Sequence, residues 1–142
     1  DGYHIRLNKC KAAYVYGDKE KIKQVLSNFV SNAIKYCGED RVVNVDVKRI
    51  GKKVRVDIID HGEGIASDEL SHVWERYYRT SANRNRSIEG SGLGLSIVKG
   101  ILVLHNANYG VKSKIGQGSD FWFEMDTVKK PTDTESKNKT HG

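Results

Sequence analysis

The stretch Glu89-Gly90-Ser91-Gly92-Leu93-Gly94-Leu95-Ser96-Ile97-Val98-Lys99 has glycine at three alternate positions and continues into an apolar segment. Glycine tolerates positive φ and allows a ligand to approach the backbone closely. The N-terminus of a helix adds unpaired N–H groups and the positive end of a dipole, which together suit phosphate. The stretch therefore predicts either a phosphate-binding turn or, more simply, a glycine-rich loop that precedes a core helix.

Two common nucleotide-binding motifs are excluded by the sequence. Leu95 occupies the position at which the dinucleotide-binding fingerprint requires its third glycine. A Walker-type Gly-Lys-Ser/Thr sequence does not occur anywhere in the chain. A nucleotide at this turn must therefore be held in another way, with residues from elsewhere in the sequence.

The composition indicates one globular domain. The chain has 142 residues, of which 37% are hydrophobic and 30% charged, enough for one core. No apolar run reaches membrane-spanning length, so we expect no direct membrane contact from this segment. The net charge of +6 would attract an anionic ligand, but it is spread along the chain and does not indicate nucleic-acid binding. We predict a domain over residues 1–127 and a disordered polar tail over residues 128–142.

Hydrophobic periodicity predicts three helices and six strands. The predicted strands cover residues 3–7, 12–16, 42–49, 53–60, 109–114 and 119–126. The predicted helices cover residues 19–36, a segment that is capped by Ser67 and runs through Tyr77, and residues 94–105. Residues 79–89 contain three arginines and no apolar periodicity, which predicts a mobile basic loop directly before the glycines.

A polar stripe follows one side of the helix predicted over residues 19–36. Asn28, Asn32 and Lys35 have the spacing i, i+4, i+7 and therefore share one face. Asparagine is a mediocre helix former, so two of them one turn apart need an explanation. The simpler explanation is a solvated polar face. The functional one is that the amide oxygens face Mg²⁺, which takes oxygen ligands, while Lys35 faces an anion.

Asp60 is a second candidate because of its place at the end of a predicted strand. It shares the parity of the apolar residues in the strand over residues 53–60, which places its carboxylate on the covered face. A buried carboxylate requires hydrogen-bond donors, and either a ligand amine or a backbone N–H of the next loop would serve. Gly62 and Gly64 follow at once and predict a tight turn close to whatever Asp60 binds.

Three motifs thus occur in a fixed order: Asn-x-x-x-Asn-Ala-x-Lys on a helix, Asp-x-Gly-x-Gly after a strand, and Gly-x-Gly-x-Gly before a helix. Together they resemble the catalytic ATP-binding domain of bacterial sensor histidine kinases, within the superfamily that includes gyrase B, Hsp90 and MutL. The resemblance covers residues 5–126. It implies an α/β two-layer sandwich, in which helices cover one face of a mixed β-sheet and ATP lies between the first long helix and the loop before the glycines.

The resemblance also implies a role for each matching residue. Asn32 would be the main Mg²⁺ ligand, and Asp60 would accept a hydrogen bond from the adenine amine. Asn28, Lys35 and Arg79 would form the catalytic set, with Asn28 supporting the metal or phosphate. The other matching positions are Tyr36 beside the nucleotide, Gly62, Gly64 and Ile65 in the adenine turn, Tyr78 near the adenine or the loop, and Gly90, Gly92, Leu93 and Gly94 around the phosphates.

Asn28 separates the kinases of this superfamily from its ATPases. The ATP-hydrolysing members carry Glu at this position as a general base toward water, and asparagine cannot accept a proton at neutral pH. The resemblance therefore implies a protein-histidine kinase domain that transfers the γ-phosphoryl group to a histidine on a separate dimerisation domain. A response-regulator receiver domain would accept the group next. Catalysis would consist of positioning and of charge neutralisation by Mg²⁺, Lys35 and arginines.

The sequence also carries expectations about the parent protein. The family's phosphoacceptor pattern, a His followed by an acidic residue and usually a Pro, is absent, so we expect this chain not to phosphorylate itself. Because the chain opens on Asp1, we expect it to be part of a longer protein. By family habit, that parent would be a membrane sensor with this domain in the cytoplasm.

Two other functions share the same motifs. An anti-sigma-factor-type serine kinase belongs to the same superfamily, but the segment from Trp74 to Arg79 resembles a histidine-kinase box and argues against it. A non-catalytic nucleotide-binding module is the second alternative, and the intact asparagines and glycines argue against such degeneration.

Overall fold

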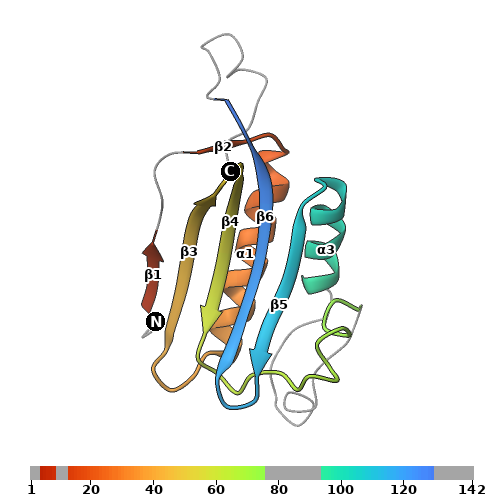
Figure 1. The fold of residues 1–142 in the computed structure, drawn as a ribbon. Helices are drawn as coiled ribbons and strands as arrows, with labels where there is room; N and C mark the ends of the chain where they lie inside the picture. Colours follow the sequence, from red (N-terminus) through yellow and green to blue (C-terminus); the bar gives the residue numbers. More distant parts are fainter. Residues whose placement is uncertain (1–3, 9–12, 76–93, 130–142) are drawn as a thin grey trace.

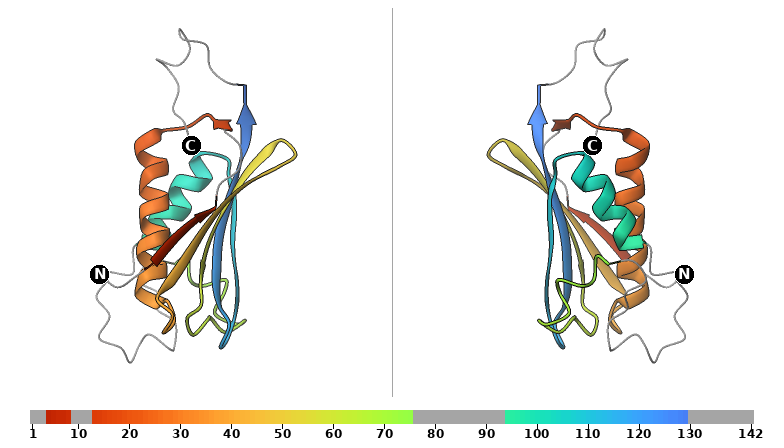
Figure 2. Two further views of the ribbon diagram at one scale, coloured as in Figure 1. Left: turned by 90° about the vertical axis from the view of Figure 1, so that its left-hand side faces the viewer. Right: turned by 90° about the vertical axis from the view of Figure 1, so that its right-hand side faces the viewer.

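The computed structural model describes residues 4–8, 13–75 and 94–129. In these ranges the chain forms one sheet with two helices on one of its faces, as Figure 1 and Figure 2 show. The strands are β1 (His4–Asn8), β2 (Tyr14–Val15), β3 (Val42–Ile50), β4 (Lys53–Asp60), β5 (Asn108–Lys114) and β6 (Gly118–Val128). The helices are α1 (Lys19–Tyr36) and α3 (Gly94–Leu104). Neither described helix has the length and apolarity to cross a membrane.

The sheet is mixed, as the family resemblance implies. Its strand order is β1-β3-β4-β6, with β5 paired to β6 and β2 added at the far end of β6. β1 runs parallel to β3, and the other pairs are antiparallel. Val128, which the sequence analysis assigns to the tail, is the last residue of β6 and pairs with Tyr14. Val128 thus belongs to the sheet, and the tail stays a prediction because residues 130–142 lie outside the described part.

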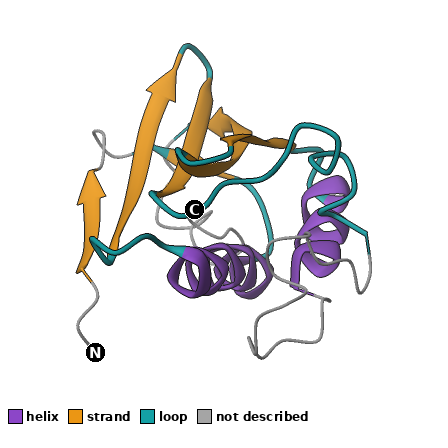
Figure 3. Cartoon of the chain, turned by 90° about the horizontal axis from the view of Figure 1, so that it is seen from below, coloured by secondary structure: helices purple, strands orange, loops and turns teal. Residues whose placement is uncertain are grey.

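The periodicity of α1 accounts for its place on the sheet (Figure 3). Asp18 caps the helix by accepting the N–H of Lys21 at 3.1 Å. The buried side of α1 carries apolar residues one turn apart, and the ring centroid of Phe29 lies 5.7 Å from that of Phe121 on β6. Because the apolar side packs on the sheet, the predicted helix over residues 19–36 is confirmed and its polar stripe lies outside the core.

The helix predicted to start at Ser67 is wrong over residues 67–75. The N–H groups of Glu69, His72 and Glu75 bond to carbonyls three residues earlier, so this segment forms successive turns. The ring of Trp74 packs edge-on against Phe29 and other core aromatics, so the turns still bury the aromatic residue that the predicted helix would have buried. A spacing of three residues serves these turns as well as a helix, and the rest of the predicted helix lies outside the described residues.

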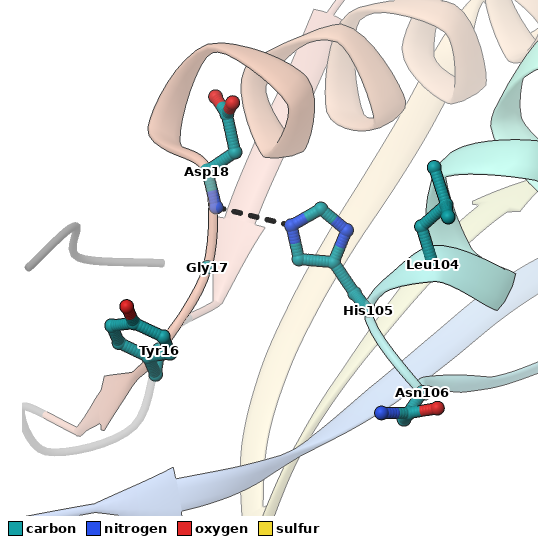
Figure 4. Close-up of a pocket in the computed structure, with 6 residues that line it drawn as sticks. All are labelled: Tyr16, Gly17, Asp18, Leu104, His105 and Asn106. Carbon is teal, nitrogen blue, oxygen red and sulfur yellow. Dashed lines mark hydrogen bonds between the residues drawn. The ribbon is translucent and has the colours of Figure 1, made fainter.

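His105 connects the start of α1 with the last turn of α3 (Figure 4). The N–H of Asp18 lies 3.0 Å from His105 Nε2, and the carbonyl oxygen of Ile101 lies 2.8 Å from Nδ1. An amide N–H can only donate and a carbonyl can only accept, so this arrangement requires the tautomer with its proton on Nδ1. The pocket around the ring is lined by Tyr16, Gly17, Asp18, Leu104, His105 and Asn106.

The sheet face opposite the helices carries a buried acidic pair. Asp57 is 5% exposed, and Arg55 Nε lies 3.0 Å from its Oδ1 while the guanidinium stacks on the ring of Trp122. Asp120 Oδ1 is buried and receives no donor among the described residues. Burial, then the charge of Asp57 and a hydrogen bond with it, raises the pKa of Asp120 to about 7. Two carboxyls can share such a bond only while one of them holds a proton.

We expect Asp120→Asn to stabilise the fold above about pH 7 and to flatten its pH dependence. A carboxyl whose pKa is raised on folding stabilises most below about pH 4, and this contribution is lost as the pH rises to about 7. The asparagine amide can donate to Asp57 at every pH. Urea unfolding across this pH range measures the effect. Asp126→Asn removes an exposed carboxylate of the same strand and should change little, whereas equal slopes in wild type and Asp120→Asn would contradict the shared proton.

Candidate functional site

The polar stripe of α1 meets the first residue of α3. Asn28 Nδ2 donates to the carbonyl oxygen of Gly94 at 3.3 Å. This bond uses the donor end of the amide, so the oxygen of Asn28 is the end available to a ligand. Gly94 is the third glycine of the Gly-x-Gly-x-Gly motif. The structure therefore brings the asparagine and the glycine-rich motifs together, 66 residues apart in sequence.

The C-terminal end of α1 meets the turn that follows Asp60. A Cβ at Gly62 would collide with the carbonyl oxygen of Tyr36, and a Cβ at Gly38 would collide with that of His61. Only glycine permits this close stacking of the two backbones. The rise of α1 between Asn28 and Tyr36 is about 12 Å. Gly94 and the turn after Asp60 thus both contact α1, at a separation along the helix that an extended nucleoside triphosphate can span.

Asp60 is buried at the end of β4, as its parity predicts, with 3% of its surface exposed. Its Oδ1 accepts the N–H of Gly62 at 2.9 Å. Burial raises the pKa of Asp60 to about 6, while the N–H groups of Gly62 and Ser119 act in the opposite direction. Backbone N–H groups thus supply part of the hydrogen bonding that the buried carboxylate of Asp60 requires. Because burial still dominates, a further donor from a ligand would stabilise the ionised form.

The hairpin between β5 and β6 holds the turn after Asp60. Gly64 has φ 78°, and a Cβ there would collide with the carbonyl oxygen of Lys114. The N–H of Ile65 donates to Ser113 Oγ at 2.8 Å, and that hydroxyl donates to the carbonyl of Gly118 at 2.7 Å. Sequence reasoning missed the role of Ser113, because a serine near a strand end gives no local signal of a partner 48 residues away.

The remaining predicted site residues divide into two groups. Asn32 and Tyr36 are half-buried on α1, and Lys35 is exposed. Trp74, which begins the predicted aromatic box, packs with its ring centroid 5.0 Å from that of Tyr109. The other predicted residues, Tyr78, Arg79, Gly90, Gly92 and Leu93, lie outside the described residues.

The side-chain atoms of the α1 stripe that could coordinate a metal determine which metal it could hold. Among the described residues, no group of three or more His, Cys, Asp and Glu side chains is arranged to hold a metal ion. The stripe instead offers the amide oxygens of Asn28 and Asn32. Neutral oxygen ligands fit Mg²⁺ that also contacts phosphate and water, and they do not fit a soft metal.

Comparison with known proteins agrees with this geometry. Residues 17–129 match the family described as histidine kinase-, DNA gyrase B-, and HSP90-like ATPase. The sensor-like histidine kinase SenX3 of Mycobacterium tuberculosis is 39% identical over 107 residues, which are 75% of this chain and 26% of SenX3.

Two solved structures share the fold. A mycobacterial sensor histidine kinase, MprB, superimposes with a TM-score of 0.80 and 25% identity, covering 91% of this chain and 86% of the other. Full-length ShkA in complex with AMPPNP gives a TM-score of 0.78 and 28% identity, covering 92% of this chain and 27% of ShkA.

The chain spans about a quarter of the length of the curated relatives that it matches. The family match itself extends over most of the chain and over every described motif. This chain therefore belongs to the family of histidine kinase-, DNA gyrase B- and HSP90-like ATPases.

Proposed function

We propose that this chain is the ATP-binding catalytic domain of a sensor histidine kinase. It transfers the γ-phosphoryl group of Mg²⁺-ATP to a histidine on a separate dimerisation domain. The observation that carries the proposal is the position of α1, which contacts Gly94 through Asn28 and Gly62 through the carbonyl of Tyr36. This supports a nucleotide along α1, with its adenine at Asp60 and its phosphates at the start of α3.

One end of the proposed site binds the adenine, and the other end binds the metal and the phosphates. Asp60 accepts the adenine amine within the turn of Gly62, Gly64 and Ile65, while Tyr36 packs beside the nucleotide. Asn32 would be the main ligand of Mg²⁺, and Asn28 would support the metal or the phosphate. Bound Mg²⁺ would neutralise phosphate charge, and Lys35 and Arg79 would add positive charge. Gly90, Gly92, Leu93 and Gly94 surround the phosphates at a helix N-terminus.

Asn28 favours transfer to histidine over hydrolysis. An amide cannot take a proton from water, and its nitrogen is already engaged by the carbonyl of Gly94. An incoming imidazole needs no such base, because its lone pair forms the P–N bond as the bond to the leaving ADP breaks. The site then has only to align the two groups and to balance charge.

We also infer the partners and the setting from this proposal. The phosphoacceptor domain of the parent supplies the histidine, and a response-regulator receiver domain accepts the phosphoryl group from it. The relatives are sensor kinases, and ATP is available in the cytoplasm, so the parent presents this domain there from a membrane sensor.

Calorimetric titration with ATP, with and without Mg²⁺, tests the binding half of the proposal. We expect Mg²⁺ to tighten ATP binding and Asn32→Ala to remove most of that gain. Ser31→Ala, an exposed neighbour on α1, should leave it intact. No heat of ATP binding under either condition would refute a nucleotide site.

Transfer is tested with radiolabelled ATP and a separately supplied phosphoacceptor domain. Phosphohistidine is labile to acid, so we expect label on the acceptor that acid removes. Acid-stable label would indicate a serine kinase instead. ATP binding without any transfer would indicate a non-catalytic module.

The affinity for Mg²⁺-ATP should fall as the pH drops below about 6. Burial raises the pKa of Asp60 to about 6, so below that pH the carboxylate is protonated and no longer accepts the adenine amine as an anion. The dissociation constant should rise by at most about tenfold per pH unit there. Titrations at saturating Mg²⁺ measure the profile, and an affinity that is constant through this range would contradict the role of Asp60.

A further inference from the structure

Asp40 and His61 connect the turn after α1 with the turn after β4. His61 Nδ1 lies 2.6 Å from Asp40 Oδ2. The other oxygen of Asp40 accepts the N–H of Val42 at 3.1 Å, which fixes the carboxylate at the start of β3. Because an ionised carboxylate can only accept, His61 Nδ1 carries a proton in this contact. The N–H of Val42 and the bond with His61 both lower the pKa of Asp40.

This pair lies at the junction that positions Asp60. Gly38 stacks on the carbonyl of His61, and Gly62 stacks on the carbonyl of Tyr36, so the two turns meet backbone to backbone. The Asp40–His61 contact joins the same two turns through side chains. It therefore lies next to the residue that we assign to adenine, and it joins the turn that donates a hydrogen bond to Asp60 with the turn that follows α1.

The charges around Asp60 act on it in opposite directions. His61 lowers the pKa of Asp60, and Asp40 raises it. The thiol of Cys37 is also close, and its own pKa is raised by burial, Asp40 and Asp60. Two arginines of the described residues also act at this junction: Arg41 on Cys37 and Arg6 of β1 on Asp40.

We propose that the Asp40–His61 pair joins the two turns at the adenine end of the site and acts on nucleotide binding through Asp60, by holding its turn in place and by the charge that it brings close to the carboxylate. The inference rests on the proposed function, because it assumes that Asp60 binds the adenine amine. His61 favours the ionised form of Asp60 and Asp40 disfavours it, while Asp40 also orients the ring of His61. His61 and Asp40 are thus positioning residues that act through Asp60.

The exposed fractions of the three side chains indicate where a charge change at the pair should act. The side chains of His61 and Asp40 are 48% and 42% exposed, so their mutual attraction adds little to stability. Asp60 is 3% exposed, and a buried carboxylate is screened less from neighbouring charges than a surface group. A charge change at the pair should therefore alter Asp60 more than it alters the fold.

Two conservative substitutions test the proposal. His61→Asn removes the charge but keeps an amide N–H for Asp40, and should move the midpoint of the pH profile for Mg²⁺-ATP binding upward. Asp40→Asn keeps an acceptor for Val42 and should move the midpoint downward. We expect shifts of about half a pH unit at low ionic strength, and smaller shifts at high salt. The double variant should return close to the wild-type midpoint.

The control is a matching pair elsewhere in the chain. His72 Nδ1 lies 2.7 Å from Glu75 Oε2 with similar exposure, and His72→Asn should leave the profile unchanged. If the midpoint of the pH profile stays at its wild-type value in both junction variants, the pair does not act through the charge of Asp60 and the proposal is overturned, even if binding weakens equally at every pH. If the wild-type protein shows no ATP binding, the proposed function itself fails, and the two results are distinct.

Discussion

Asp60→Asn is expected to weaken ATP binding by about 100-fold, which corresponds to about 2.7 kcal/mol. Asparagine keeps the shape of the side chain and can still accept the N–H of Gly62 through its oxygen. Its amide nitrogen then takes the place of the second carboxylate oxygen and presents a donor to the donor of adenine. Both groups would be left unsatisfied where Asp60 is buried from water, which makes the loss large. Calorimetric titration at about pH 8 measures it, where wild-type Asp60 is ionised.

Asp57→Asn is the matched control for this prediction. Asp57 lies on the same strand and is 5% exposed, but its side chain projects from the opposite face of the sheet. The same chemical change there should leave the affinity for ATP unchanged. Equal losses in the two variants would show that the effect arises from the strand as a whole, and would remove Asp60 from the adenine site.

Gly62→Ala is expected to destabilise the fold by about 3 kcal/mol and to abolish detectable ATP binding. The added Cβ collides with the carbonyl oxygen of Tyr36, which is backbone and cannot rotate away. The turn must therefore move off the end of α1, and the donor of Gly62 moves away from Asp60. Urea unfolding and ATP titration together measure the two effects.

Gly100→Ala provides the contrast. Gly100 lies within α3, and a Cβ there meets nothing within 4 Å. The same substitution should stabilise the protein by about 0.5–1 kcal/mol, because alanine favours the helical backbone. A Gly62→Ala protein as stable as wild type would contradict the close packing of the two turns.

The elements that face the core could be predicted from the sequence. The apolar repeat of α1 and the alternation along β4 report burial directly, which is why the position of Asp60 follows from parity alone. The turns over residues 67–75 escaped prediction, because Trp74 and its neighbours satisfy a core with either turn or helix geometry. Periodicity identifies which residues are buried, but it does not distinguish two backbones that bury the same side chains.

The supporting contacts of the site could not be predicted in the same way. Ser113, Asp40 and His61 act through partners that are distant in sequence, and nothing in their local pattern marks them. Asp57 is a related case, since its neighbours in the strand read as a polar face. Its burial depends on Arg55 and on Trp122 of β6, which only the strand register brings together.

The imidazole of His105 has a mechanical consequence for the two helices on the sheet. It joins the N-cap amide of α1 to the final turn of α3, while the opposite end of α3 carries Gly94 beside Asn28. If the Gly94 end of α3 is displaced, we therefore expect α3 to rotate about its end at His105, which stays attached to α1.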